Sequence, residues 1–401
     1  MADPRPRLVK FETQRSFALR LVLATLTGKT IRVSNIRPSS TNPGLANYEI
    51  SFIRLLEAVT NGSAMEISYT GTTIAYKPGL ITGCAPGRGA SGGVIRHELP
   101  EGCPRGLSYF LIPLCLLAPF SKAPINVLFT GPGVITSATP MGDISVDSVR
   151  TAILPLYEQF GIFNNIELRI LRRSCPGPGG KGGAGEVQLM FGHQVRVPKT
   201  IHMMNPGRVK RIRGVAYCVG VSASNNARMI DVARGILNPL VSDTYVFSDV
   251  SSAPLIPSAT KADPNAKRKL GIGFGLSLVA ESSTGAFYSA DVASPPEGGV
   301  PPEDIGRQCA YQLLETISLG GCVSPAAAQT MLVLMAMGSE DVGRLRVGKK
   351  VFATEEIIDL GRDLSQLGAS GWGVRDADAE GEDLIVSIVG SGFGNVGRKI
   401  A

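Results

Sequence analysis

Histidine is scarce in this chain and absent after position 202. The 401 residues contain only His97, His193 and His202. A nucleophile that accepts a phosphoryl group needs a side chain of suitable pKa and geometry. No histidine after position 202 is therefore available to supply one.

The seven cysteines form no Cys-x-x-Cys pair, which argues against a zinc site. Their number is odd, and several lie in apolar runs, such as Cys115 between Leu114 and Leu116. Both features are typical of reduced, buried thiols in an intracellular protein. We expect neither a metal nor a cofactor.

Long apolar runs and aromatic residues are also few. The longest apolar run, Tyr109–Phe120, is too short to span a bilayer and contains two prolines. The first ten residues are polar and basic, unlike a secretory signal. Aromatic residues make up 6% of the chain, which disfavours a stacking platform for single-stranded bases. We expect no membrane association, and any RNA contact should involve backbone and shape.

The remaining composition is that of a folded protein with a basic balance. Hydrophobic residues make up 44% and charged residues 18%, as in globular chains. The net charge of +7 favours a polyanionic partner, although many mildly basic proteins bind no nucleic acid. A chain of this length can bury a large core divided into two or three units.

One local pattern recurs along the sequence. An apolar run of helical period is followed by a turn and then by a strand of alternating apolar residues. Repetition of this unit predicts an α+β core of stacked sub-domains. The predicted pairs of helix and strand are Phe17–Leu26 with Thr30–Ile36, Ile50–Val59 with Met65–Tyr69, Leu111–Phe120 with Ile125–Phe129, Val149–Phe160 with Ile166–Leu171, Thr330–Met337 with Arg344–Val347, and Glu355–Leu367 with Asp383–Val389.

Residues 31–80 carry a resemblance to a known family. This stretch contains Ile36-Arg37, Asn42-Pro43-Gly44-Leu45, Thr70-Gly71-Thr72 and Pro78-Gly79. It resembles the first part of the RNA 3′-terminal phosphate cyclases, and the likeness continues with gaps from about Phe11 to the end. The chain is most similar to the eukaryotic branch that works in ribosome assembly without cyclase activity.

The resemblance implies three repeated βαβαββ units in a large domain, interrupted by a smaller inserted α/β domain. We place the large domain at residues 1–189 and 289–401, and the insert at 190–288. The insert follows a Gly-rich segment and precedes the linker Ala293–Pro302. Within it, Asn225–Leu237 has a helical pattern. Val241–Asp263 is rich in Ser, Pro and Ala, which predicts that part of it is an exposed loop.

The resemblance also implies where the cyclase nucleophile should stand. The enzymes carry His-x-x-Asp-Gln before a late apolar helix, which here is matched by Gln329–Gly338. Counting back from Gln329, Pro325 occupies the histidine position and Ala328 the aspartate position. We therefore expect no adenylated histidine and no cyclase activity.

A second departure lies near the N-terminus. The cyclases have a Gly-rich turn with an acid before their first helix, whereas this chain has Glu12–Phe17, with Thr13 at the acidic position. Losing the glycines closes off backbone approach to a phosphate. Arg20 and Arg37 match family arginines, and we predict that they face an anion-binding crevice.

Further basic residues are candidates for RNA contact. Arg172 and Arg173 precede the Gly-rich loop Cys175–Gly185, whose backbone amides could form an anion-binding concavity. A flexible surface loop is the alternative. Arg208 begins a basic stripe. Its side chains either contact RNA phosphates or form a solvated strand edge. The candidates in this stripe are Lys210, Arg211 and Arg213.

A last cluster follows the late apolar helix. Arg344, Arg346 and Lys349 could hold an RNA phosphate, or form a solvated strand face. Asp341 could act with Arg344 and Lys349 in strand cleavage, although one carboxylate makes a poor metal site.

Together these features predict a non-catalytic relative of the cyclases. The resemblance implies a nuclear, nucleolar factor of small-subunit assembly that is needed for early pre-rRNA cleavage. It also implies three kinds of partner: a ribosome-assembly GTPase, pre-ribosomal RNA and proteins of the small-subunit processome. Two alternatives stay open, namely an endoribonuclease that cuts pre-rRNA and a protein adaptor without RNA contact.

Overall fold

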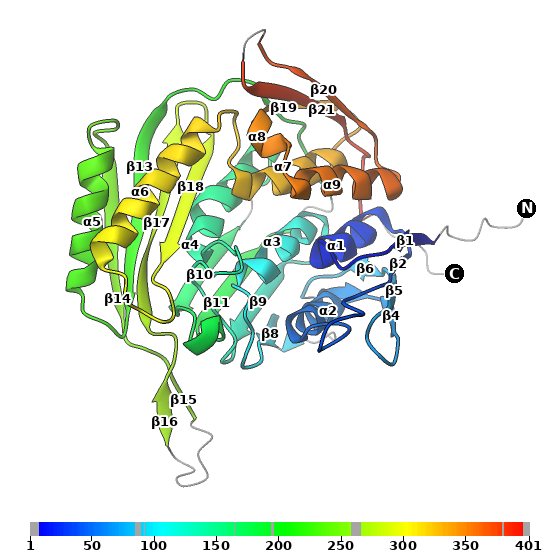
Figure 1. The fold of residues 1–401 in the computed structure, drawn as a ribbon. Helices are drawn as coiled ribbons and strands as arrows, with labels where there is room; N and C mark the ends of the chain where they lie inside the picture. Colours follow the sequence, from blue (N-terminus) through cyan, green and yellow to red (C-terminus); the bar gives the residue numbers. More distant parts are fainter. Residues whose placement is uncertain are drawn as a thin grey trace, which may run out of the picture.

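The structure is a computed structural model that describes residues 8–84, 90–91, 93–163, 165–193, 196–257, 266–378 and 381–395. Three of its sheets repeat one arrangement, in which the strands of a βαβαββ unit lie in the order first, second, fourth, third. Figure 1 shows helices of the three units gathered in the middle, where α1, α3 and α7 pack together. The predicted α+β class with three repeated units is confirmed.

Local sequence explains the helix ends of the first unit. Helix α1 ends at Gly28, whose φ of 66° suits the left-handed position after a helix. Helix α2 begins three residues earlier than predicted, because the Ala46 backbone N–H donates to Glu49 at 2.8 Å. The elements are β1 (Val9–Phe11), α1 (Phe17–Thr27), β2 (Ile31–Val33), α2 (Asn47–Val59), β4 (Ala64–Ile67) and β5 (Ile74–Lys77), with a separate pair β3 (Thr60–Asn61) and β6 (Leu80–Ile81).

The second unit contains an irregular helix where a regular one was predicted. Residues 146–160 form a short α-turn, then a π-turn and then a 3₁₀ segment. The reason is Pro155, which has no N–H to donate and so breaks the α-helical hydrogen-bond pattern. The elements are β7 (Ala90–Ser91), β8 (Val94–Glu98), α3 (Ser108–Leu117), η1 (Ala118–Phe120), β9 (Ile125–Thr130), α4 (Val146–Ser148), η2 (Val149–Ile153), η3 (Leu154–Phe160), β10 (Glu167–Arg172), η4 (Pro178–Gly180) and β11 (Glu186–Phe191).

The third unit is split in the sequence. Its first strand pairs in parallel with β19, with His202 opposite Arg344, although more than a hundred residues separate them. Proline at the first position of α7 fits a helix start, where the missing N–H has no partner to lose. The elements are β12 (His202–Met203), α7 (Pro325–Met337), β19 (Val342–Gly348), α8 (Lys349–Phe352), α9 (Glu355–Gln366), β20 (Trp372–Asp376) and β21 (Asp383–Val389).

The intervening chain forms a fourth sheet, ordered β14-β13-β17-β18. Helices α5 and α6 lie side by side on one of its faces (Figure 1). A two-stranded arm, β15–β16, projects from the same region. The elements are β13 (Val209–Val219), α5 (Ser224–Leu237), β14 (Thr244–Ser251), β15 (Leu255–Pro257), β16 (Lys267–Lys269), β17 (Gly273–Ser282), β18 (Phe287–Ala293) and α6 (Pro302–Ser318).

Strand pairing bears on two sequence-based expectations. Part of Val241–Asp263 was expected to be exposed loop. Residues 244–251 form β14, in which Thr244 and Val246 are buried and Tyr245 between them is exposed, whereas residues 258–263 lie outside the described part of the chain. The boundaries of the insert at 190 and 288 stay a prediction. We propose later ones, after Met203 and near Ser318, because β12 belongs to the third sheet and both β18 and α6 pack with the fourth.

No helix in the described part of the chain is long and apolar enough to cross a membrane.

The first and third units are joined by a buried ion pair. Arg20 of α1 donates from Nε to Asp363 of α9 at 2.7 Å, and from Nη2 at 3.1 Å. Its guanidinium also lies 4.4 Å from the ring centre of Phe11. Both charged side chains are less than a tenth exposed, so each depends on the other for solvation.

We predict that Asp363→Asn lowers the free energy of unfolding by about 3–5 kcal/mol, because it leaves the Arg20 charge buried and unpaired. A matched control is Glu355→Gln on the same helix, whose partner Arg15 is exposed. This control should cost about 1 kcal/mol or less. Chemical denaturation of the two variants checks both values, and equal losses would contradict the structural role given to Arg20.

A second prediction concerns His97 on β8. Burial, with a smaller effect from the Arg54 charge, lowers its pKa from 6.5 to about 4. The unfolded chain therefore binds an extra proton between these pH values, and stability should fall by about 3 kcal/mol as pH drops from 6.5 to 4. Neutral His97 lies 2.9 Å from the Ser51 hydroxyl.

His97→Gln keeps a polar group opposite Ser51 but does not titrate. The difference in unfolding free energy between wild type and this variant, measured against pH, isolates the histidine from the carboxylates. A difference that stays constant from pH 6.5 to 4 would refute the buried neutral state.

Candidate functional site

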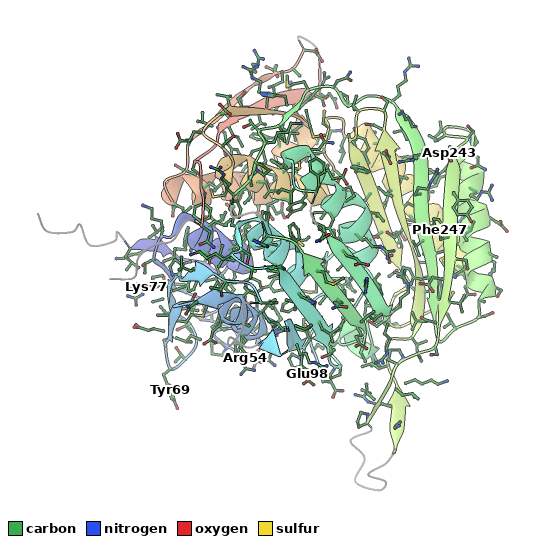
Figure 2. The ribbon with its side chains drawn as sticks, turned by 180° about the vertical axis from the view of Figure 1, so that it is seen from behind. Arg54, Tyr69, Lys77, Glu98, Asp243 and Phe247 are labelled. Atoms are coloured by element: carbon green, nitrogen blue, oxygen red, sulfur yellow. The ribbon has the colours of Figure 1, made fainter. Side chains whose placement is uncertain are left out.

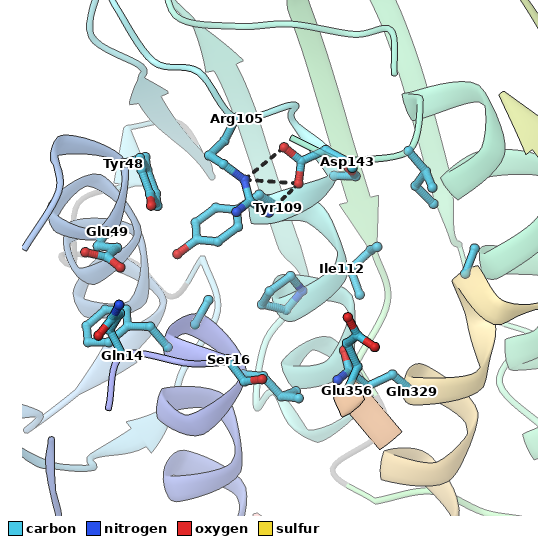
Figure 3. Close-up of a pocket in the computed structure, with 18 of the residues that line it drawn as sticks. Gln14, Ser16, Tyr48, Glu49, Arg105, Tyr109, Ile112, Asp143, Gln329 and Glu356 are labelled. Carbon is cyan, nitrogen blue, oxygen red and sulfur yellow. Dashed lines mark hydrogen bonds and ion pairs between the residues drawn. The ribbon is translucent and has the colours of Figure 1, made fainter. Parts of the chain in front are cut away.

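A cavity of about 530 Å³ lies where five helices begin (Figure 3). First-turn residues of α1, α2, α3, α7 and α9 line it, so all three units contribute. Unpaired N–H groups and aligned peptide dipoles give each helix start a partial positive charge. The lining includes Ser16 and Phe17 of the first helix start, Tyr48 and Glu49, Ser108 and Tyr109, Ala326 and Gln329, and Glu356.

Arg105 is the central cation of this crevice, and Asp143 holds it. The guanidinium Nε lies 3.1 and 2.9 Å from the two carboxylate oxygens, and Nη2 lies 2.5 Å from Oδ1. Asp143 also accepts from the Gly106 backbone N–H at 2.7 Å, a close approach that a Cβ at position 106 would block. Burial lowers the pKa of Arg105, but the hydrogen bonds and charge of Asp143 outweigh it and raise the pKa.

Arg37 is neutralised in the same way. Its Nη1 lies 3.1 Å from Glu49 Oε1, Nη2 contacts Oε2, and Nε donates to the Gly44 carbonyl at 3.0 Å. The hydrogen bond to Glu49 outweighs burial and raises the pKa of Arg37. The structure therefore places Arg37 in the lining of the crevice with its charge already paired.

Two tyrosines complete the wall. The rings of Tyr48 and Tyr109 meet edge to face with centres 5.3 Å apart, and the Arg105 guanidinium lies 4.4 Å from the Tyr109 ring centre. Burial raises the pKa of Tyr109 well above its usual value, so the hydroxyl keeps its proton. Among the described residues this buried hydroxyl has no hydrogen-bond partner, which makes it an available donor beside the cavity.

The start of α7 stands at this crevice and carries no histidine. Pro325 is its first residue, and Ala326 and Gln329 of the same turn line the cavity. Ala328 is completely buried. None of the three histidines lies in the lining: His97 is buried on β8, while His193 and His202 are exposed. Within the described part of the chain, no cluster of His, Cys, Asp or Glu could hold a metal ion.

Two predicted anion-binding arginines have other partners. Arg20 is buried against Asp363, as described above. Arg173 donates to Asp147 of the second unit from Nη1 at 2.5 Å, and to Asp249 of β14 from Nε at 2.5 Å. Burial lowers the pKa of Arg173, but these carboxylates outweigh it and raise the pKa. Their role is to join units, because a buried guanidinium with two hydrogen-bonded partners has little capacity left for a phosphate.

The Gly-rich loop Cys175–Gly185 does not form the expected anion cradle. The amides of Gly182, Gly183 and Gly185 donate to carbonyls of Cys103, Pro132 and Val134 at 2.9–3.0 Å. Most of the loop is buried between sheets, with only residues 178, 179 and 181 exposed. Its glycines therefore allow the loop backbone to pack closely against the neighbouring backbone segments.

The other basic candidates lie on the surface. Arg172 is half-exposed, with Glu186 at 3.6 Å. Arg211 pairs with Glu281, and Arg213 with Asp243, which Figure 2 shows near the outer strand of the fourth sheet. Lys210 is exposed and has no ion pair among the described residues. The basic stripe is thus a solvated strand whose charges are mostly paired.

The cluster after α7 is divided between paired and free charges. Arg346 pairs with Asp378 and Asp383, and Lys349 pairs with Asp376 at 2.7 Å. Arg344 is exposed and has no such partner in the described part of the chain. Asp341 is exposed at the residue before β19. The structure therefore does not bring Asp341, Arg344 or Lys349 into the crevice.

Sequence reasoning missed Arg105, Asp143 and Tyr109. One signal was available, because a cation just before a helix is unfavourable unless a carboxylate compensates it. Arg105 stands three residues before α3, but nothing in the sequence identifies Asp143 as its partner.

Comparison with known proteins agrees with this architecture. A family model described as RNA 3'-terminal phosphate cyclase matches residues 9–368. The chain is 39% identical over 391 residues to the RNA 3'-terminal phosphate cyclase-like protein of Mus musculus, with 95% of each chain covered. It is 36% identical over 404 residues to the rRNA processing protein RCL1 of Saccharomyces cerevisiae, with 100% of each covered. It is 37% identical over 396 residues to the rRNA processing protein rcl1 of Schizosaccharomyces pombe, covering 98% of this chain and 99% of that one. The chain therefore belongs to the RNA 3′-terminal phosphate cyclase family.

Proposed function

We propose that this chain is a non-catalytic factor of pre-rRNA processing that works in the nucleolus. It binds pre-ribosomal RNA and a ribosome-assembly GTPase within the small-subunit processome, and it is needed for early pre-rRNA cleavage. Support comes from the two relatives named rRNA processing proteins, which match nearly end to end. The relative from Mus musculus is named cyclase-like rather than cyclase.

The observation that carries the non-catalytic part is Pro325 at the start of α7. By the family pattern this is the position of the adenylated histidine, and the neighbouring residues line the crevice. Proline has no side-chain group that can accept a phosphoryl group. No histidine lies in the lining to substitute for it.

The crevice keeps features suited to binding an anion rather than transforming one. Five helix starts provide unpaired N–H groups, and Tyr109 adds a buried hydroxyl donor. Arg37 and Arg105 are each paired with a carboxylate. Their positions are therefore fixed, but they bring no uncompensated positive charge to the crevice. This arrangement favours holding a terminal phosphate or a partner carboxylate in a set position.

RNA contact then falls to exposed cations outside the crevice. Arg172, Lys210 and Arg344 are exposed, and the surface ion pairs of Arg211, Arg213 and Lys349 can exchange a carboxylate for a phosphate at little cost. Arg346 is only 24% exposed and pairs with the buried Asp383, so it does not enter this part of the proposal. Arg20 and Arg173 do not enter this part of the proposal, because their buried pairs hold units together.

Whether the protein can be adenylated is directly measurable. Purified protein incubated with labelled ATP and an RNA bearing a 3′-phosphate should give neither protein-bound AMP nor a cyclic end, because the nucleophile position is proline. Gel analysis of protein and RNA reads both outcomes. An active cyclase treated in parallel controls for the reagents. Covalent AMP on this chain would refute the proposal.

An endoribonuclease is the second candidate, favoured by the presence of an exposed carboxylate, Asp341, and an exposed cation, Arg344, at the start of β19. We expect purified protein to leave pre-rRNA intact, because one exposed carboxylate without a metal partner is a weak catalyst of strand cleavage. Asp341→Ala should then leave RNA binding and folding unchanged. The neighbouring exposed Glu340→Ala is the matched control. Specific cleavage that Asp341→Ala abolishes and Glu340→Ala retains would instead establish the nuclease.

A further inference from the structure

The arm β15–β16 has no role in the function described so far. It forms its own two-stranded sheet and projects from the body of the molecule (Figure 1). Three consecutive cations, Lys267, Arg268 and Lys269, make up strand β16, and all are exposed. The described strands of the arm contain no carboxylate.

Strand register separates these cations into two faces. Arg268 lies opposite Ile256 and forms an ion pair with Glu101 of the second unit. Lys269 lies opposite Leu255, and Lys267 opposite Pro257, on the other face. Neither lysine has an ion pair or hydrogen bond in the described part of the chain. One face of the arm is therefore directed at the body, and the other presents two free ammonium groups.

The base of the arm is fixed by the Gly-rich loop. Leu270 is buried against Gly177 and Gly182, where a Cβ at position 177 would lie 2.7 Å from its Cδ1. The Cys175 backbone N–H donates to the Gly271 carbonyl at 2.9 Å. The loop thus clamps the arm, which sets the direction of the free face.

A groove of about 490 Å³ continues this face onto the body. It is lined by the end of β10, the end of β14 and the chain leading to Leu255, which stands opposite Lys269. Arg172 and the hydroxyl-bearing Ser251 and Ser252 lie in it. Its one carboxylate, Asp249, is paired with Arg173. Arg172, which has Glu186 at 3.6 Å, lies in the groove, and Lys269 and Lys267 follow along the arm, so the three cations mark a basic path.

We propose that this path, formed by Arg172 and the free face of the arm, binds the phosphate backbone of RNA. The proposal rests on the RNA-binding function proposed above and names a site for it. An acidic protein segment is a less suitable partner, because the exposed apolar residues on this face, Leu255 and Pro257, are too few to form the core of a protein interface. Phosphate contacts need no such core, since each ammonium group gains affinity by releasing counterions.

The test uses the full-length protein and a labelled single-stranded RNA of mixed sequence, with affinity measured by anisotropy at several salt concentrations. Lys267→Ala/Lys269→Ala should weaken binding. It should also reduce the slope of log affinity against log salt by about 1.4, because each phosphate contact with a single strand contributes about 0.7. Both lysines are exposed, so the melting temperature should not change.

The matched control is Lys10→Ala/Lys77→Ala, which removes two exposed strand lysines of the first sheet. Figure 2 shows Lys77 on the opposite side of the view from the arm. This control should leave the slope unchanged. An equal loss in both double variants, or no loss in the arm variant, would overturn the arm proposal while RNA binding itself stands.

Two other results separate this inference from the proposed function. If wild-type protein fails to bind RNA at physiological salt, both proposals fall and the adaptor without RNA contact is favoured. If polyglutamate displaces RNA from wild type but not from the arm variant, at equal charge concentration, the arm selects charge alone and the assignment to RNA is overturned.

Discussion

Buried arginines that must find a carboxylate hold this molecule together. Arg20 joins the first and third units through Asp363, and Arg173 joins the second unit to the fourth sheet through Asp147 and Asp249. Removing a guanidinium from water costs several kcal/mol unless charge and hydrogen bonds compensate. The units are therefore fixed relative to one another by pairs whose members lie far apart in the sequence, and the crevice between the units inherits that geometry.

The same constraint explains which basic residues are free to act. An arginine inside the protein needs its carboxylate, so Arg37 and Arg105 are positioned by Glu49 and Asp143 and bring little net charge to the crevice. Cations on projecting strands have no such requirement. In the proposed function, RNA affinity that depends on counterion release therefore comes from the surface, where Lys267 and Lys269 are exposed and have no ion pair among the described residues.

The sequence predicted the repeated units well, because each unit's change from helical to alternating period is a local signal. It predicted poorly what depends on distant partners. Strand β14 was hidden by its Ser-rich composition and is stabilised by pairing with β13. Arg20 looked like a free family arginine, since its partner Asp363 lies 343 positions away. Asp143 was overlooked for the same reason, and Pro155 was not weighed against the helical period of its segment.

In the proposed function, the crevice is a binding scaffold that has outlasted its chemistry. Helix starts attract anions through backbone N–H groups, which nearly any sequence supplies once the helices are placed. Nucleophilic catalysis depends on one side chain at one position, and in the proposed function that position is Pro325, a residue that suits the helix start. A single substitution can therefore end phosphoryl transfer and leave the electrostatic preference of five converging helices intact. Selection for positioning RNA or a protein partner could then act on the surface without disturbing the pairs that hold the units in place.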